Sequence, residues 1–201
     1  ATMISTLFKA SVRIALAAPP PASLVPICFS NAMMCGVLLS VRTCKLSAAL
    51  SSICSLLEFS LPEREPQAEL WKATMAILEI LTLSEKETAW LPFFIKWELG
   101  LLQELGFALN LKSCAVTGSN QALAYVSPRT GRAISRPAAG NYADRLLVLP
   151  MFLGGHLETK NEFADGIKIT GHFLQKQIFN TMDKKLPSAR ERLVYLVENI
   201  N

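Results

Sequence analysis

The sequence predicts a mainly α-helical fold, a helical bundle interrupted by a small β-hairpin. Beyond residue 37, apolar side chains recur at spacings of three and four, as helices with one buried face require. That period stops at Cys114, where two short runs, residues 123–126 and 132–135, flank the sequence SPRTG. Pro128 and Gly131 in that sequence are turn formers, so the two runs are expected to pair as a hairpin.

The composition is that of a folded protein. Of the 201 residues, 51% are hydrophobic and 18% are charged, which excludes a disordered chain and allows one domain or two small ones. The apolar excess lies in residues 1–61. Residues 14–41 contain no charge and are long enough to span a bilayer, but four prolines between residues 19 and 26 break helical geometry there. We therefore expect no membrane span.

Residues 1–36 show neither strand alternation nor a helical stripe, and they are left unassigned. Because the chain begins at Ala1, it is either a fragment or has an altered start, and the sequence leaves both open. Four cysteines between residues 28 and 54 lie among apolar residues and have no metal-ligand spacing: Cys28, Cys35, Cys44 and Cys54. We expect buried thiols in a reducing, cytoplasmic compartment instead of a disulfide framework.

Two helices are expected first, over residues 37–59 and 67–83. Between them LPEREP, residues 61–66, has two prolines that end one helix and start the next, and a helix junction is favoured there over a binding role. The residues expected to be buried are Leu46, Leu50, Cys54 and Leu57 in the first helix, and Leu70, Ala73, Ile77 and Ile80 or Leu81 in the second.

The third helix is expected to be the central core helix. Ser84 and Glu87 form a capping-box pattern at its start, and Gly106 marks its end. Its apolar stripe consists of Trp90, Phe94, Trp97, Leu101 and Leu105, widened by Leu91, Ile95 and Leu102. An aromatic stripe can also form a peptide-binding groove, but core packing is favoured because so many large side chains gain from burial.

Cys114 begins the spacing of a four-cysteine zinc ribbon in which most ligands are missing. The other three ligand positions hold Thr117, Ser135 and Ala138. Structural zinc sites need four thiolate or imidazole ligands, which these residues do not supply. We therefore expect a degenerate ribbon that binds no metal.

Arginines dominate the charge of this ribbon region. Between Cys114 and Pro150 the charged residues are Arg129, Arg132, Arg136, Asp144 and Arg145, with Tyr125 and Tyr142 nearby. Arginine and aromatic side chains together suit phosphate contacts and base stacking. The alternative is a solvated turn whose charges only keep the protein soluble. Our hypothesis is that the four arginines contact DNA phosphates, which the net charge of +4 permits.

Two more helices are expected within residues 163–201. Ile167, Phe173 or Leu174, and Ile178 form the apolar face of the first. Pro187 opens the second, in which Leu193, Leu196 and Val197 are expected inside and Arg190 and Arg192 outside. With Lys184 and Lys185, these two arginines form a second basic cluster.

Several motifs in this order resemble the RecO family of DNA repair proteins. They are LPEREP, WELGLLQELGFALNLKSCAVTG, YVSPRTGRAISR, ITGHFLQKQ and LPSARERL, and the resemblance covers about residues 47–199. It implies a helical domain with an inserted ribbon. Many relatives keep four ribbon cysteines, whereas this chain resembles the branch that keeps the shape without the metal. The family also opens with an OB-fold barrel, which is not recognisable here and is absent, truncated or altered.

The resemblance divides the chain into four parts. Residues 1–36 are the unassigned apolar segment, which is a remnant or altered form of the OB-fold region. Residues 37–112 form the first part of the helical domain, residues 113–145 the degenerate ribbon, and residues 146–201 the C-terminal part of the helical domain.

The function that the resemblance implies is that of a recombination mediator of the RecF pathway. Such proteins bind single-stranded DNA, act with RecR, displace single-strand binding protein, aid RecA loading and anneal strands. No enzyme activity and no cofactor are expected, because His156 and His172 have no spaced catalytic or metal-binding partner and no GxxxxGK[ST] loop occurs. One alternative is a helical protein-interaction module that does not itself bind DNA. Another is a membrane-associated protein, an interpretation that depends only on the apolar residues 1–61.

Overall fold

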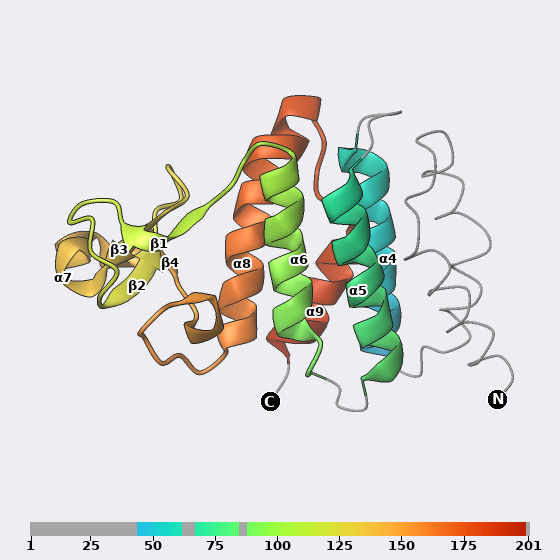
Figure 1. Ribbon diagram of the computed structural model, residues 1–201, viewed down its shortest axis with the longest axis horizontal. Helices are drawn as coiled ribbons and strands as arrows, with labels where there is room; N and C mark the ends of the chain where they lie inside the picture. The colour runs from blue at the N-terminus through green and yellow to red at the C-terminus, as the bar shows by residue number, and fades with distance from the viewer. Residues whose placement is uncertain (1–43, 62–66, 85–87, 200–201) are drawn as a thin grey trace, which may run out of the picture. The chain divides into compact units, whose positions relative to one another are not determined.

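A computed structural model of the protein describes residues 44–61, 67–84 and 88–199. The chain forms two compact units: the described residues up to Trp97 with Pro187–Leu193, and Glu98–Leu186 with residues 194–199. The elements in chain order are α4 (Cys44–Ser60), α5 (Ala68–Leu83), α6 (Leu91–Glu104), β1 (Asn110–Cys114), β2 (Leu123–Val126), β3 (Arg132–Ser135), α7 (Arg136–Ala139), η1 (Gly140–Arg145), β4 (Leu147–Val148), η2 (Met151–Leu153), α8 (Glu162–Leu174), η3 (Gln175–Phe179), η4 (Asn180–Met182) and α9 (Ser188–Glu198) (Figure 1). The mainly α fold with a small sheet is confirmed.

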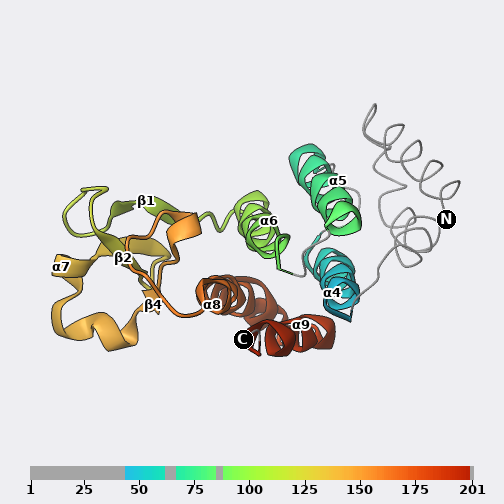
Figure 2. The same cartoon turned by 90° about the horizontal axis from the view of Figure 1, so that it is seen from below.

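In the first unit, α4 and α5 lie side by side (Figures 1 and 2). Both bury the apolar stripe expected of them, except at two positions. Cys54 is only half-buried, and Ala73 is exposed, so its expected burial is wrong. The reason is that the buried row of α5 follows Leu70, Thr74, Ile77 and Leu81 at spacings of four, three and four, which places Ala73 beside that row.

The first half of α6 and the residue before it supply the aromatic core of the first unit. The Trp90 and Phe94 rings meet edge to face with centroids 6.0 Å apart, and both side chains are fully buried. The Trp97 ring lies 6.0 Å from Phe94, and its Nε1 donates a hydrogen bond of 2.9 Å to Thr74 Oγ1. The predicted core stripe is therefore confirmed, although Leu105 is only half-buried.

The start of α6 differs from the prediction. Ser84 ends α5, because its N–H donates to the Ile80 carbonyl at 2.9 Å, and α6 begins only at Leu91. Glu87, the second member of the expected capping box, lies outside the described residues. The helix end is as predicted. Gly106 has φ +85°, and the N–H groups of Gly106 and Phe107 donate to the carbonyls of Gln103 and Leu102, which is a Schellman stop.

The second unit contains a four-stranded sheet with the order β1-β3-β2-β4. The β2 and β3 strands form the predicted antiparallel hairpin with the predicted bounds. The outer strands were not predicted: β1 pairs parallel to β3, and the two-residue β4 pairs antiparallel to β2. The short helix α7 contacts both strands of the hairpin, as Figure 1 shows.

The helix α8 also belongs to the second unit and packs against β4 and η2. Asn161 caps it, because its Oδ1 accepts from the Ala164 N–H at 3.1 Å. The expected apolar face is confirmed by the burial of Ile167, Phe173, Leu174 and Ile178. The helix then continues as the π-helical turn η3.

The last helix, α9, begins after Pro187 as predicted, since the Arg190 N–H donates to the Pro187 carbonyl. Leu193 and Val197 are buried and Leu196 is half-buried. Arg190 was expected outside, but only 3% of its surface is exposed, so that prediction is wrong. It lies three residues before Leu193 and therefore shares the buried face of the helix. Arg192 is exposed as expected.

Several sequence predictions fall outside the described residues. They concern residues 1–36, the uncharged run 14–41, the charged part of LPEREP, Cys28 and Cys35. In the part of the chain that the structure describes, no helix is long and apolar enough to cross a membrane. Of the remaining cysteines expected to be buried, Cys54 is half-buried and Cys44 is exposed, so the expectation for Cys44 is wrong.

Candidate nucleic-acid interface

Three of the four ligand positions of the degenerate ribbon, Cys114, Thr117 and Ser135, come together around the Cys114 sulfur. Cys114 is fully buried at the end of β1, and Ser135 lies at the end of β3. The Ser135 N–H donates to Cys114 Sγ at 3.3 Å, and Sγ lies 3.5 Å from Ser135 Oγ. A tight turn follows Cys114, because the Gly118 N–H donates to the Cys114 carbonyl and the Cys114 N–H to the Ser119 carbonyl.

Hydrogen bonds determine the charge state of this thiol. Burial raises the pKa of Cys114, but hydrogen bonds from the side chains and backbones of Ser135 and Thr117 outweigh burial and lower the pKa to about 6. The side chains that could bind a metal here are one thiol and two hydroxyls, which do not match the four thiolate or imidazole ligands of structural zinc. Among the described residues, no group of three or more His, Cys, Asp and Glu side chains is placed to hold a metal ion.

The hairpin turn is fastened to α8 by two side chains. The His172 ring lies with Nε2 2.9 Å from the Pro128 carbonyl oxygen. Lys176 Nζ donates to the carbonyls of Pro128 and Arg129, both at 2.9 Å. The backbone of the turn that contains Arg129 is thus held by a charged donor, and hydrogen bonds of this kind are stronger than neutral ones. We call His172 and Lys176 the α8 clamp.

The turn also packs closely on α8. Gly131 has φ +69°, and a Cβ added there would lie 2.6 Å from Leu109 Cδ2 and 3.5 Å from the Phe173 ring. A glycine is favoured at this position chiefly by its positive φ, which strains other residues, because the end of the flexible Leu109 side chain could move aside. Lys176 lies in the π-helical turn η3, whose Asn180 N–H donates to the Gln175 carbonyl.

All four arginines named from the sequence are exposed. Arg129 lies in the turn between β2 and β3, Arg132 begins β3, and Arg136 begins α7. Three of them thus lie within residues 129–136, around one strand. Arg145 ends η1, two residues before β4, and the pairing of β4 with β2 brings it to the same sheet.

Strand spacing gives the scale of this arrangement. One strand, β2, lies between β3 and β4. Neighbouring strands are about 4.8 Å apart, so the backbones of β3 and β4 are about 10 Å apart. The exposed Lys112 on β1 adds a positive charge next to β3. Five exposed basic residues therefore lie in the sheet or next to it, and we refer to them as the basic surface: Lys112, Arg129, Arg132, Arg136 and Arg145.

Sequence reasoning missed the α8 clamp and Lys112. His172 and Lys176 are four residues apart on the continuous helix formed by α8 and η3, but their acceptors lie more than forty residues earlier in the chain. Lys112 was missed because β1 was not predicted. The other histidine, His156, is exposed.

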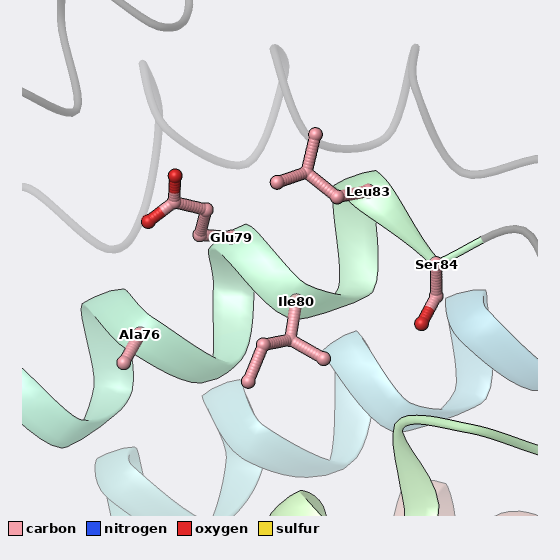
Figure 3. Close-up of a pocket in the computed structure, with 5 residues that line it drawn as sticks. All are labelled: Ala76, Glu79, Ile80, Leu83 and Ser84. Carbon is pink, nitrogen blue, oxygen red and sulfur yellow. The ribbon is translucent and has the colours of Figure 1, made fainter.

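A pocket in the first unit is lined by four residues from the last turns of α5 and by the residue that follows the helix: Ala76, Glu79, Ile80, Leu83 and Ser84 (Figure 3). Leu83 is 57% exposed there. The lining is apolar apart from one serine and one carboxylate, so it suits an apolar partner side chain better than a phosphate.

Comparison with known proteins assigns the chain to a family. The family model described as "Recombination protein O C terminal" matches residues 42–187. A DNA repair protein RecO of Cereibacter sphaeroides (strain ATCC 17029 / ATH 2.4.9) is 47% identical over 152 residues, which is 75% of this chain and 62% of that protein. Proteins of the same name from Rhodospirillum centenum and Paracoccus denitrificans are each 47% identical, over 150 and 148 residues.

These matches cover 58% and 59% of the last two relatives, so the chain spans about three-fifths of the length of these curated relatives. No solved structure matches it significantly. The match to the family model covers more than half of the chain and includes the helices α4 to α8 and the ribbon. The chain belongs to the RecO family.

Proposed function

We propose that this chain is part of a recombination mediator in DNA repair that binds single-stranded DNA through the basic surface. The observation that carries the proposal is that four arginines, all exposed, lie in or next to one small sheet, and that the turn containing Arg129 is held by the α8 clamp. A fixed backbone lowers the ordering cost of contacting a phosphate, since fewer degrees of freedom are lost on binding. Arginine is the side chain best suited to that contact.

The partners in this proposal are those of the family. The mediator acts with RecR on strands covered by single-strand binding protein, aids the loading of RecA and promotes annealing of complementary strands. It acts in the cytoplasm, makes and breaks no covalent bond and needs no cofactor. The four-part division of the chain at residues 36, 112 and 145 belongs to the same proposal, with DNA contacts assigned to the ribbon.

Titration of a fluorescent single-stranded oligonucleotide with the full chain at low salt tests the proposal. A variant with alanine at Arg129, Arg132, Arg136 and Arg145 is expected to lose most of its affinity, because phosphate contacts dominate binding. The matched control replaces Lys96, Lys160, Lys168 and Lys185, which are also exposed. Both variants lower the net charge from +4 to 0, so a loss confined to the arginine variant assigns binding to the surface and not to total charge. Equal affinity of the two variants would contradict the assignment.

A second candidate function is a protein-interaction module without its own DNA binding. The α5 pocket with the exposed Leu83 favours it (Figure 3). If the wild-type chain binds no oligonucleotide at low salt but still binds RecR, and Leu83→Lys abolishes that binding, the second candidate replaces the first.

A further inference from the structure

Tyr142 is the most exposed aromatic side chain of the basic region. It is 66% exposed and lies in the short 3₁₀-helix η1, directly after α7. Gly140, with φ +48°, turns the chain from α7 into η1, and the two short helices contact each other.

The geometry of η1 puts this ring beside an arginine. In a 3₁₀-helix the side chains at positions i and i+3 lie one above the other. Tyr142 and Arg145 therefore share one row along η1. A second row consists of Asn141 and Asp144, so the one carboxylate of η1 points to a different side. The third row contains Ala143, which is half-buried and faces the protein.

The charges around this row favour a polyanion. Arg145 is on it, and Arg136 begins the helix that η1 contacts. An aromatic ring next to guanidinium groups is the combination that single-stranded nucleic acids require, since the ring stacks on a base while the cations contact phosphates. In a duplex the base faces are already stacked on each other and are not available to the ring.

We infer that Tyr142 stacks on an unpaired base while Arg145 contacts a neighbouring phosphate, so that this row recognises single strands. The inference rests on the proposed function and adds a base-recognition site to the phosphate contacts. The ring, and not the hydroxyl, makes the contact. The contribution of one stacked base corresponds to about tenfold in affinity.

Two oligonucleotides separate stacking from charge: oligothymidylate, and an abasic strand of equal length that has the same phosphates without bases. The wild-type full chain is expected to bind oligothymidylate about tenfold more tightly than the abasic strand. Tyr142→Ala is expected to lose that preference and to bind the abasic strand as the wild type does. Tyr142→Phe keeps the ring and is expected to keep the preference.

Tyr195 on α9 provides a stringent control, because it is 67% exposed and has Arg192 three residues before it. Glu191 and Glu198 lie within one helical turn of Tyr195, so its surroundings are less favourable to a polyanion. Tyr195→Ala is expected to bind both strands like the wild type.

The outcomes distinguish the inference from the function on which it rests. If Tyr142→Ala binds oligothymidylate like the wild type, or if it loses the same affinity for both strands, the stacking role is wrong while phosphate binding stands. If Tyr142→Phe behaves like Tyr142→Ala, ring stacking is also wrong. If the wild type binds neither strand, the proposed function fails and the inference fails with it.

Discussion

The helices of the first unit and the ribbon of the second are stabilised in different ways. The first unit buries large side chains such as Trp90, Phe94 and Ile53. The buried apolar side chains of the ribbon are small or medium-sized: Cys114, Leu123, Ala124, Val126, Ala133 and Ala139. Since stabilisation by burial rises with apolar area, the ribbon gains less from it and depends more on hydrogen bonds at Cys114 and at the α8 clamp. The helical region thus provides most of the core, and the ribbon carries the surface that we propose contacts DNA.

The largest effect is expected in the aromatic core. Phe94→Ala removes a fully buried ring that contacts Trp90 and Trp97, and it is expected to lower the free energy of unfolding by about 3–5 kcal/mol. The neighbouring Phe93 is 49% exposed, so Phe93→Ala is the matched control and is expected to change stability by about 0.5 kcal/mol or less. Urea unfolding measures both. Similar losses for the two variants would contradict the assigned core.

An intermediate effect is expected at the α8 clamp. Lys176→Met keeps the aliphatic stem but removes the ammonium group that donates to the Pro128 and Arg129 carbonyls. Hydrogen bonds from a charged donor stabilise a fold by about 1.5 kcal/mol, so the turn is expected to lose about that much. Hydrogen exchange of the backbone amides of Gly131 and Arg132 is expected to accelerate about tenfold, because lowering the free energy of local opening by about 1.4 kcal/mol raises the open population tenfold. Lys168→Met, at an exposed position of the same helix, serves as the control. Unchanged exchange in Lys176→Met would show that the turn does not depend on the clamp.

The smallest effect is expected at Cys114 and depends on pH. Hydrogen bonding lowers the pKa of the folded-state thiol to about 6, below its value in the unfolded chain. The resulting stabilisation is absent below pH 6 and grows as pH rises, because the folded state then releases its proton before the unfolded state does. The difference in unfolding free energy between the wild type and Cys114→Ser is expected to increase by about 1 kcal/mol from pH 6 to pH 7.

In that experiment, subtracting the unfolding free energy of Cys114→Ser from that of the wild type cancels the contributions of the other titrating groups. Cys54 is not involved, since burial raises the pKa of its thiol. A difference that is constant with pH, or that shrinks as pH rises, would mean that the sulfur stays a neutral thiol over this pH range and that its ionisation does not stabilise the ribbon.

The sequence predicted the parts of the fold that depend on local patterns. Helical periodicity located the helices, Gly106 marked a helix end, and SPRTG located the hairpin. The errors have physical reasons. The β1 strand forms only by parallel pairing with a distant strand, and β4 has two residues, so neither has a periodic signal. Arg190 was placed outside because charged residues are usually exposed, although its spacing from Leu193 puts it on the buried face.

The candidate site could be predicted only in part. Arginine content singled out the four residues proposed to contact phosphates, and ribbon spacing singled out Cys114, Thr117 and Ser135, which meet in the structure. The α8 clamp was not predictable, because its acceptors are backbone carbonyls, which every residue has. Tyr142 was visible as an aromatic residue, but its shared row with Arg145 depends on the 3₁₀ geometry of η1.

The central claim is that the ribbon, and not the helices, contacts the phosphates of single-stranded DNA. The dependence of affinity on salt concentration measures this directly, because the slope of log K against log salt is about −0.7 for each phosphate neutralised on a single strand. Replacing Arg129, Arg132, Arg136 and Arg145 by alanine is expected to make the slope shallower by up to about 2.8, whereas replacing Lys96, Lys160, Lys168 and Lys185 leaves it unchanged. A slope that stays the same in the arginine variant and flattens in the lysine variant would contradict the claim.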